Sequence, residues 1–399
     1  MQPSRRSLIR LFMAAVIVAP AYAADGDKPS LSPFTVEMYR QLAAGDANAF
    51  FSPSSIAQAV AMLREGARGE TADEILKALQ LSPDGIKTAF DPLDRLAAGD
   101  NPAILLSNAN SAWVEQTFPL RKDFADTLQS RYSAADFNCD FKGKPDVERI
   151  RINQWVEKQT HDRIKDLIAP GLIDPAARLI LANAIYFKAT WQNPFEARAT
   201  SDQDFTLADG AKVKAKLMSR GNTPGGFYQD EQLQLLDLPY KGGSLAMFII
   251  LPRQHDGLAA IEKDLTGKKL DELAAKVKSG SGLVQLPRFK FEVKYELNAA
   301  LQAIGVRRAF VFGQADLTGV SDSTEAKLLY VSQAIHKAFV EVNEEGTEAA
   351  AATALVLRSG GAPRPPANIF RADHPFLFLI RDTKTGAVLF MGRMSDPTK

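Results

Sequence analysis

Four histidines are the side chains in this sequence that could act as general bases or metal ligands near neutral pH. They stand at His161, His255, His336 and His374, and none lies in an HExxH or similarly spaced metal-binding pair. The sequence also lacks a G-x-S-x-G elbow, an S-x-x-K motif and a P-loop. We therefore expect no metal, no cofactor and no enzymatic activity. A catalytic triad assembled only in space stays open as a minor hypothesis.

Two further groups of reactive side chains favour structural interpretations. Glu344 and Glu345 are adjacent, and adjacent residues of an extended chain point in opposite directions, so the pair predicts solvated charge rather than a catalytic acid and base. Cys139 is the one cysteine, which excludes an intramolecular disulfide and a cysteine-built zinc site. No CxxC motif or nearby histidine accompanies it, so we predict a small apolar residue in or near the core.

Composition limits the partners and the domain number. The 399 residues carry 48 Lys and Arg against 47 Asp and Glu, a net charge of +1 that offers no large basic surface for nucleic acid or anionic lipid. With 46% hydrophobic residues the chain can bury a large core. No internal repeat or long linker divides it, so residues 24–399 are expected to form one domain, and we expect a monomer.

The first 23 residues have the pattern of a signal peptide. Arg5, Arg6 and Arg10 give a basic start, residues 11–19 form a short apolar run, and residues 21–23 (AYA) form a small-x-small cleavage site. The run is too short for a permanent membrane anchor. Residues 4–8 (SRRSL) also resemble a twin-arginine signal, so the export route stays open. The mature protein is expected in the periplasm or outside the cell.

The secondary structure that must position any functional residues is predicted to be helical early in the chain and mainly strand later. Phe34, Met38 and Leu42 lie on one helical stripe. A second helix is predicted from Ser52 as N-cap and Pro53 at the first position to Gly66.

Later segments predict strands. The apolar runs at residues 179–187, 245–251 and 328–331 have strand length. Residues 376–380 and 387–391 predict a hairpin across the polar turn 381–386. Continuous hydrophobicity indicates strands that are buried on both faces. The expected fold class is therefore α+β with a large covered sheet.

One segment departs from the pattern of a compact domain. More than twenty residues, 342–366, join a strand-like segment (338–342) to the C-terminal hairpin, which is far longer than an ordinary connection. Its alanines and prolines could form an exposed helix and a flexible tether. Its two-residue alternation favours an extended chain instead, with residues 347, 349, 351, 353, 355 and 357 on one face and Glu348 and Arg358 on the other. Such a segment can be exposed and can also enter a sheet.

The run EEGTEAAAAT at residues 344–353 resembles the hinge of inhibitory serpins, and further motifs extend the resemblance over nearly the whole mature chain. In order they are NAFFSPSSI (48–56), NAIYFK (183–188) with Trp191 and Phe195, ADLTGV (315–320), HKA (336–338), HPFLF (374–378) and FMGR (390–393). Several independent motifs in the expected order identify the sequence as similar to the serpin family.

The resemblance implies a fold of about nine helices and three β-sheets, with a reactive-centre loop at about residues 344–366 exposed above the body. It also implies a mechanism. A serine or cysteine protease attacks the loop and forms a covalent acyl-enzyme. The cut loop then enters the central sheet as a new strand and distorts the attached protease before deacylation. The protein is consumed and is not a turnover enzyme.

Three sets of residues are carried over from the family. The hinge comprises Glu345, Gly346, Thr347, Glu348, Ala349, Ala350, Ala351, Ala352 and Thr353. The shutter, which holds the central sheet closed, comprises Ser52, Asn183 and His336. The breach, at the top of that sheet, comprises Trp191, Arg288 and Glu344, with Arg288 and Glu344 expected to form a salt bridge.

The position of the cut stays open. The family spacing from the hinge glycine places it between Gly360 and Gly361, but glycine fills no specificity pocket. Arg358-Ser359 suits a trypsin-like protease, and Leu357 or Val356 suits a chymotrypsin-like or elastase-like one. A non-inhibitory serpin that acts as a binding or storage module is the alternative function. The small residues of the hinge favour the inhibitor, because bulky or charged residues there would obstruct insertion.

Cleavage of the signal peptide gives the first testable prediction. The exported protein is expected to begin at Ala24, because Ala21 and Ala23 supply the small side chains that signal peptidase requires. The intact mass of protein recovered from the periplasm or medium measures this directly. A mass that still includes residues 11–19 would contradict the predicted processing.

Overall fold

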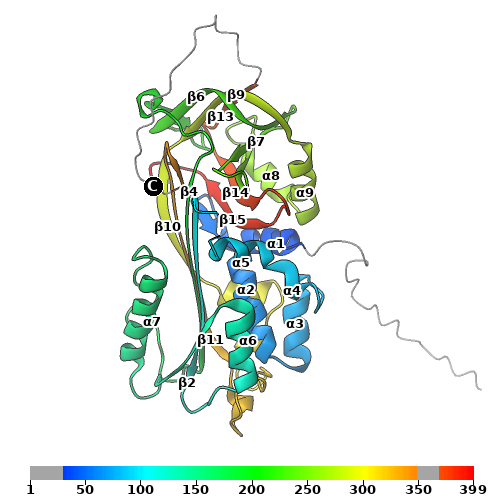
Figure 1. The fold of residues 1–399 in the computed structure, drawn as a ribbon, viewed down its shortest axis with the longest axis vertical. Helices are drawn as coiled ribbons and strands as arrows, with labels where there is room; N and C mark the ends of the chain where they lie inside the picture. The colour runs from blue at the N-terminus through cyan, green and yellow to red at the C-terminus, as the bar shows by residue number, and fades with distance from the viewer. Residues whose placement is uncertain (1–29, 100, 348–367) are drawn as a thin grey trace, which may run out of the picture.

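The computed structural model describes residues 30–99, 101–347 and 368–399 (Figure 1). The predicted signal peptide and most of the predicted loop lie outside the described residues. The helices are α1 (Ser32–Leu42), α2 (Pro53–Gly66), α3 (Gly69–Leu79), α4 (Ile86–Ala89), α5 (Asp91–Ala97), α6 (Lys122–Tyr132), α7 (Pro145–Gln159), α8 (Leu258–Asp264), α9 (Gly267–Lys276) and α10 (Asn298–Ala303). No helix in these ranges is both long enough and apolar enough to cross a membrane.

The described strands outnumber the helices. They are β1 (Ala49–Phe51), β2 (Ile104–Glu115), β3 (Ala135–Cys139), β4 (Leu179–Thr190), β5 (Ser201–Thr206), β6 (Lys212–Gln229), β7 (Leu233–Pro239), β8 (Leu245–Pro252), β9 (Lys278–Pro287), β10 (Phe289–Glu296), β11 (Val331–Val342), β12 (Gly346–Thr347), β13 (Asn368–Arg371), β14 (Phe376–Asp382) and β15 (Val388–Met394). Together with the helices they confirm the predicted α+β class.

The six-stranded sheet, called the central sheet below, has the order β10-β11-β12-β4-β2-β3. Its long strands run along the molecule in Figure 1, with α7 over one face and α2 on the other side. Alternate residues of β4 serve the two faces. Ile180, Ala182 and Ala184 pack with residues of α7, whereas Ile185 and Phe187 join the core between the central sheet and the second sheet. Burial on both faces explains why the β4 sequence is continuously apolar, as predicted.

The second sheet joins the remaining strands in the order β1-β15-β14-β8-β7-β6-β9-β13, with β5 also paired to β6. Three sheets were expected, but hydrogen bonds among the described residues define two. The reason is β6, whose 18 residues pair with β5 at one end and with β7 at the other, and with β9 along most of its length. One long strand therefore fuses two groups of strands into a single hydrogen-bonded sheet.

Local sequence signals place most of these elements correctly. The Ser52 side chain accepts a hydrogen bond from the Ser55 amide and caps α2, which ends at Gly66 as predicted. Strands β14 and β15 form the predicted antiparallel hairpin, and Cys139 is buried. The strand predicted at residues 328–331 is wrong. Leu328 ends a 3-10 turn, in which the Leu329 amide bonds to the Ala326 carbonyl, and β11 begins only at Val331.

Candidate functional site

The candidate site lies between the two middle strands of the central sheet, β4 and β11. These strands run parallel and pair directly from Val331 to Ala338, opposite Leu179 to Ile185. His336 is paired with Asn183 in this register. The other neighbours, β10 and β2, are both antiparallel to them. The β4–β11 pair is therefore the line along which a new antiparallel strand could enter the sheet.

The three predicted shutter residues are in contact across this line. The Ser52 amide donates a hydrogen bond of 3.1 Å to Nε2 of His336. Because Nε2 is an acceptor, Nδ1 carries the proton and donates to Oδ1 of Asn183. Ser52 Oγ donates to the Leu389 carbonyl at 2.6 Å, which ties the start of α2 to the C-terminal hairpin. The network thus joins β4, β11, α2 and β15.

His336 must stay neutral for this arrangement. Its ring is completely buried, and the loss of hydration lowers its pKa to about 3. A proton added at Nε2 would face the Ser52 amide hydrogen and would abolish that hydrogen bond. The shutter therefore depends on a histidine that does not ionise at neutral pH.

The polar network extends beyond the three predicted shutter residues. Asn183 Nδ2 donates to Ser55 Oγ and to Oδ1 of Asn110, which lies directly opposite it on β2. Asn108 and Asn110 both donate to Oε1 of Gln58, at 2.6 and 2.7 Å. Two asparagines at alternate positions of the strand β2, Asn108 and Asn110, are the signal that could have predicted this network.

The start of the hinge is already placed in the sheet. Gly346 and Thr347 form β12 between β4 and β11 and are antiparallel to both. Thr347 pairs with Ala189 on one side and with Val342 on the other. A Cβ built at Gly346 would overlap the carbonyl oxygen of Ala189. Glycine is required here by this close approach of two backbones.

The segment before β12 is fixed by hydrogen bonds from the end of β4. The Trp191 amide donates to the Glu345 carbonyl at 2.8 Å, and the Phe195 amide donates to the Glu344 carbonyl at 2.7 Å. The indole Nε1 of Trp191 donates to the Asn343 carbonyl at 3.0 Å. Oδ1 of Asn343 accepts from the amides of Glu345 and Gly346, which closes a tight turn. The chain therefore enters the sheet in one defined direction.

The predicted breach residues lie together above this turn. Arg288 Nε is 3.5 Å from Oε2 of Glu344, and Thr200 Oγ1 donates to Oε1 of the same carboxylate at 2.7 Å. The Glu344 side chain is only 12% exposed, so the prediction that it is solvated charge is wrong. The Arg288 side chain is 45% exposed, and a pair of this exposure contributes at most about 1 kcal/mol.

Comparison with known proteins identifies the family. A family model described as Serpin (serine protease inhibitor) matches residues 29–397. This chain belongs to the serpin family. A leukocyte elastase inhibitor of Equus caballus is 39% identical over 374 residues, covering 91% of this chain and 97% of the relative. An uncharacterized serpin-like protein of Thermococcus kodakarensis is 37% identical and covers 92% of this chain and 85% of the relative.

A solved structure has the same fold. Serpin48 of Tenebrio molitor, described as a highly specific serpin, matches with a TM-score of 0.82 and 32% identity, covering 94% of this serpin and all of that chain. Relatives that are named as protease inhibitors support protease inhibition as the class of activity and a protease as the partner.

The remaining predicted site residues lie outside the described residues. They are the hinge residues Glu348, Ala349, Ala350, Ala351, Ala352 and Thr353 and the cleavage candidates Leu357, Arg358, Ser359, Gly360 and Gly361. The structure thus places the shutter, the breach and the first part of the hinge of this serpin, and these together form one continuous site along β4 and β11.

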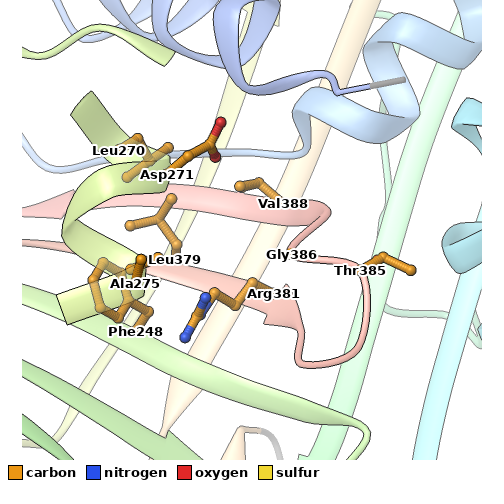
Figure 2. Close-up of a pocket in the computed structure, with 10 residues that line it drawn as sticks. Phe248, Leu270, Asp271, Ala275, Leu379, Arg381, Thr385, Gly386 and Val388 are labelled. Atoms are coloured by element: carbon orange, nitrogen blue, oxygen red, sulfur yellow. The ribbon is translucent and has the colours of Figure 1, made fainter. Parts of the chain in front are cut away.

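A cavity of about 290 Å³ lies apart from this site, between α9 and the strands of the second sheet (Figure 2). Asp271 on α9 and Arg381 on β14 are its charged lining residues. Oδ2 of Asp237 accepts a hydrogen bond of 2.7 Å from Arg381, which holds this guanidinium against the ring of Phe248. None of the predicted site residues lines the cavity.

The buried His336 predicts how stability depends on pH. Below the ordinary histidine pKa of about 6.5 the unfolded chain takes up a proton that the folded serpin does not, so stability is lost as the pH falls from 6.5 towards 3. We expect a loss of about 2 kcal/mol at pH 5 relative to pH 7.5 from this residue. Urea unfolding of the wild type and of His336→Gln at both pH values measures it.

His336→Gln is the reference for the pH dependence of stability, because glutamine does not titrate. His336→Gln is expected to be less stable at pH 7.5 but to lose less stability on acidification. His161→Gln, at an exposed position, serves as the matched control and is expected to follow the wild type. An equal pH dependence for wild type and His336→Gln would show that His336 does not carry this effect.

Proposed function

We propose that this serpin is an irreversible suicide inhibitor of serine proteases. The protease serine attacks the carbonyl of the scissile bond in the loop, an ester forms, and the amine of the next residue leaves as a new N-terminus. The loop on the acyl side then inserts into the central sheet and carries the protease with it. The observation that carries the proposal is β12, which already lies between β4 and β11 in the antiparallel direction that an inserted loop requires.

The register of β12 defines where the rest of the loop would go. Thr347 is opposite Ala189 and Val342. Six residues further along, in the same register, Thr353 would come opposite Asn183 and His336, the shutter pair. Insertion to that depth must break the parallel pairing of β4 with β11 and the hydrogen bond between Asn183 and His336. The shutter is therefore the barrier that keeps the uncut form from inserting its loop.

The face presented to the core also agrees with the loop sequence. Cross-strand partners share a face, so Thr347 lies on the face of Ala189 and Val342, which are both in the core between the two sheets. Residues 349, 351 and 353 would follow on that face, and they are two alanines and a threonine. About ten new strand residues at about 1 kcal/mol each make insertion worth about 10 kcal/mol, comparable with the stability of a whole domain. The uncut form is accordingly proposed to be metastable.

The proposal includes export. The predicted signal peptide would place the mature protein in the periplasm or outside the cell, where we propose that it acts as a monomer on a protease that forms a covalent complex with it. Mixing the purified protein with a panel of serine proteases, followed by denaturing gel electrophoresis and mass spectrometry, tests this. A stable covalent complex and a large rise in the melting temperature after loop cleavage are expected. A cleaved form that melts with the intact form would support the non-inhibitory alternative.

Substitution of Thr347 tests insertion directly. Its side chain is only 1% exposed in the structure. Thr347→Arg would require the sheet to bury an unpaired charge at the first step, at a cost of several kcal/mol. Insertion should then become slower than deacylation. The variant is expected to be cut in its loop without forming a stable complex, as measured by the ratio of cleaved inhibitor to trapped protease.

Glu348→Arg is the matched control for this prediction. In an inserted strand the two-residue alternation would direct the side chain of residue 348 away from the core, so this variant is expected to remain an inhibitor. The cleaved Thr347→Arg form should also show a smaller gain in melting temperature than the cleaved wild type. Trapping by both variants at the wild-type level would refute insertion as the mechanism.

The choice of target protease rests on the residue before the cut. Arg358→Ala is expected to abolish covalent trapping of trypsin-like proteases and to leave the melting temperature unchanged, because the pocket of these enzymes recognises a long cationic side chain. Complex formation with trypsin, measured by gel electrophoresis, checks this. Unchanged trapping would assign the cut to Gly360 or Leu357 instead.

A further inference from the structure

The hydroxyl of Tyr240 is the group that contacts the inserted side chain of the hinge. Tyr240 follows β7, is completely buried, and lies 2.7 Å through its hydroxyl oxygen from Oγ1 of Thr347. Within the described part of the chain, Thr347 is the one hydrogen-bond partner of this hydroxyl. A buried tyrosine hydroxyl requires such a partner, because an unpaired one loses its hydration without compensation.

Tyr240 is held rigidly in place. Its ring stacks on Trp191 with centroids 4.6 Å apart and an angle of 11° between the planes, and it meets the edge of Phe187 at 5.6 Å. Its amide donates to the Leu245 carbonyl, and the next amide, of Lys241, donates to the Thr190 carbonyl. The segment that carries Tyr240 is therefore attached to the end of β4, and its hydroxyl is held at a fixed position beside the entry point of the hinge.

The sheet is already separated where Thr347 enters. Backbone pairing of β11 with β4 stops at Ala338 and Ile185, and β12 pairs with Val342 and Ala189 at the top. Three residues on each strand, 339–341 and 186–188, lie between these two pairings. The first inserted residue is thus bound at the open end of the line along which the loop would enter.

We propose that Tyr240 is a positioning residue that holds the hinge docked in the register of an inserted strand before any protease arrives. The inference rests on the proposed inhibitory function. Docking of Thr347 fixes the register and direction of the first step, so that after cleavage the remaining residues can extend an existing strand rather than nucleate one. Loss of the Tyr240 hydroxyl would release the hinge and slow insertion relative to deacylation.

Tyr240→Phe keeps the stacked ring and removes only the hydroxyl. Hydrogen exchange of the intact protein, followed by mass spectrometry of peptides that contain residues 343–347, measures docking without any protease. We expect exchange there to be about tenfold faster in Tyr240→Phe and in Thr347→Val, which removes the same bond from the other side. The double variant is expected to exchange no faster than either single variant, because both remove one shared interaction.

Two controls separate docking from general destabilisation. Thr347→Ser keeps a hydroxyl, so residues 343–347 are expected to exchange at the wild-type rate in this variant. Tyr132→Phe removes a buried tyrosine hydroxyl that bonds to Glu65 between α6 and α2, and it is expected to leave exchange at residues 343–347 unchanged. Unchanged exchange in Tyr240→Phe would overturn the proposal. So would a double variant whose increase in exchange rate equals the product of the increases in Tyr240→Phe and Thr347→Val.

A second measurement tests inhibition, with a protease that the wild type traps in the panel described above. Tyr240→Phe is expected to raise the number of inhibitor molecules cleaved per protease trapped, at least twofold. Faster exchange with an unchanged ratio would also overturn the positioning role. If the wild type traps no protease, the proposed function fails, whereas the exchange measurement still decides whether Tyr240 docks the hinge.

Discussion

The direct parallel pairing of β4 with β11 is the constraint on which the rest of the structure depends. Every other neighbour of these two strands is antiparallel to them, including the two residues of β12. A strand added between these two parallel strands would be antiparallel to both if it continued the direction of β12. The proposed insertion would add its strand along this pair, and the hydrogen bond between His336 and Asn183 lies across the same line.

The polar network of the shutter is buried because it lies between α2 and the central sheet. It joins the start of α2 to β2, β4 and β11, in the layer between the helix and the sheet. A network of this kind stabilises only when all its members are paired, so it resists small displacements and fails when the strands separate. On the opposite face of the sheet, Lys337 also links β11 to neighbouring segments. Its ammonium group donates to the Lys165 carbonyl and pairs with Glu292, which ties β11 to the segment after α7 and to β10.

The breach contributes in a different way, because it combines exposed charge with buried aromatic rings. The pair of Arg288 and Glu344 is half exposed and weak, while Trp191 and Tyr240 beneath it are stacked and buried. The backbone of residues 343–346 is attached mainly through amides at and beyond the end of β4. Direction of entry is therefore set by backbone hydrogen bonds, and the ion pair adds little. Among the described residues, the Tyr240 hydroxyl is the side-chain group that forms a hydrogen bond with Oγ1 of Thr347.

The sequence by itself determined the features that depend on local pattern. These include the Ser52 cap of α2, the doubly buried strand β4, the C-terminal hairpin, and the order of motifs that identified the family. Only the tertiary structure decided which distant polar groups meet. Gln58, Asn108 and Asn110 joined the shutter, Glu344 proved largely covered, and Tyr240 proved to face Thr347, because each partner comes from another strand or helix. The fusion of two groups of strands through β6 was likewise not predictable. Periodicity reports which face a residue occupies, but the partner on that face is set by the packing of segments far apart in the chain.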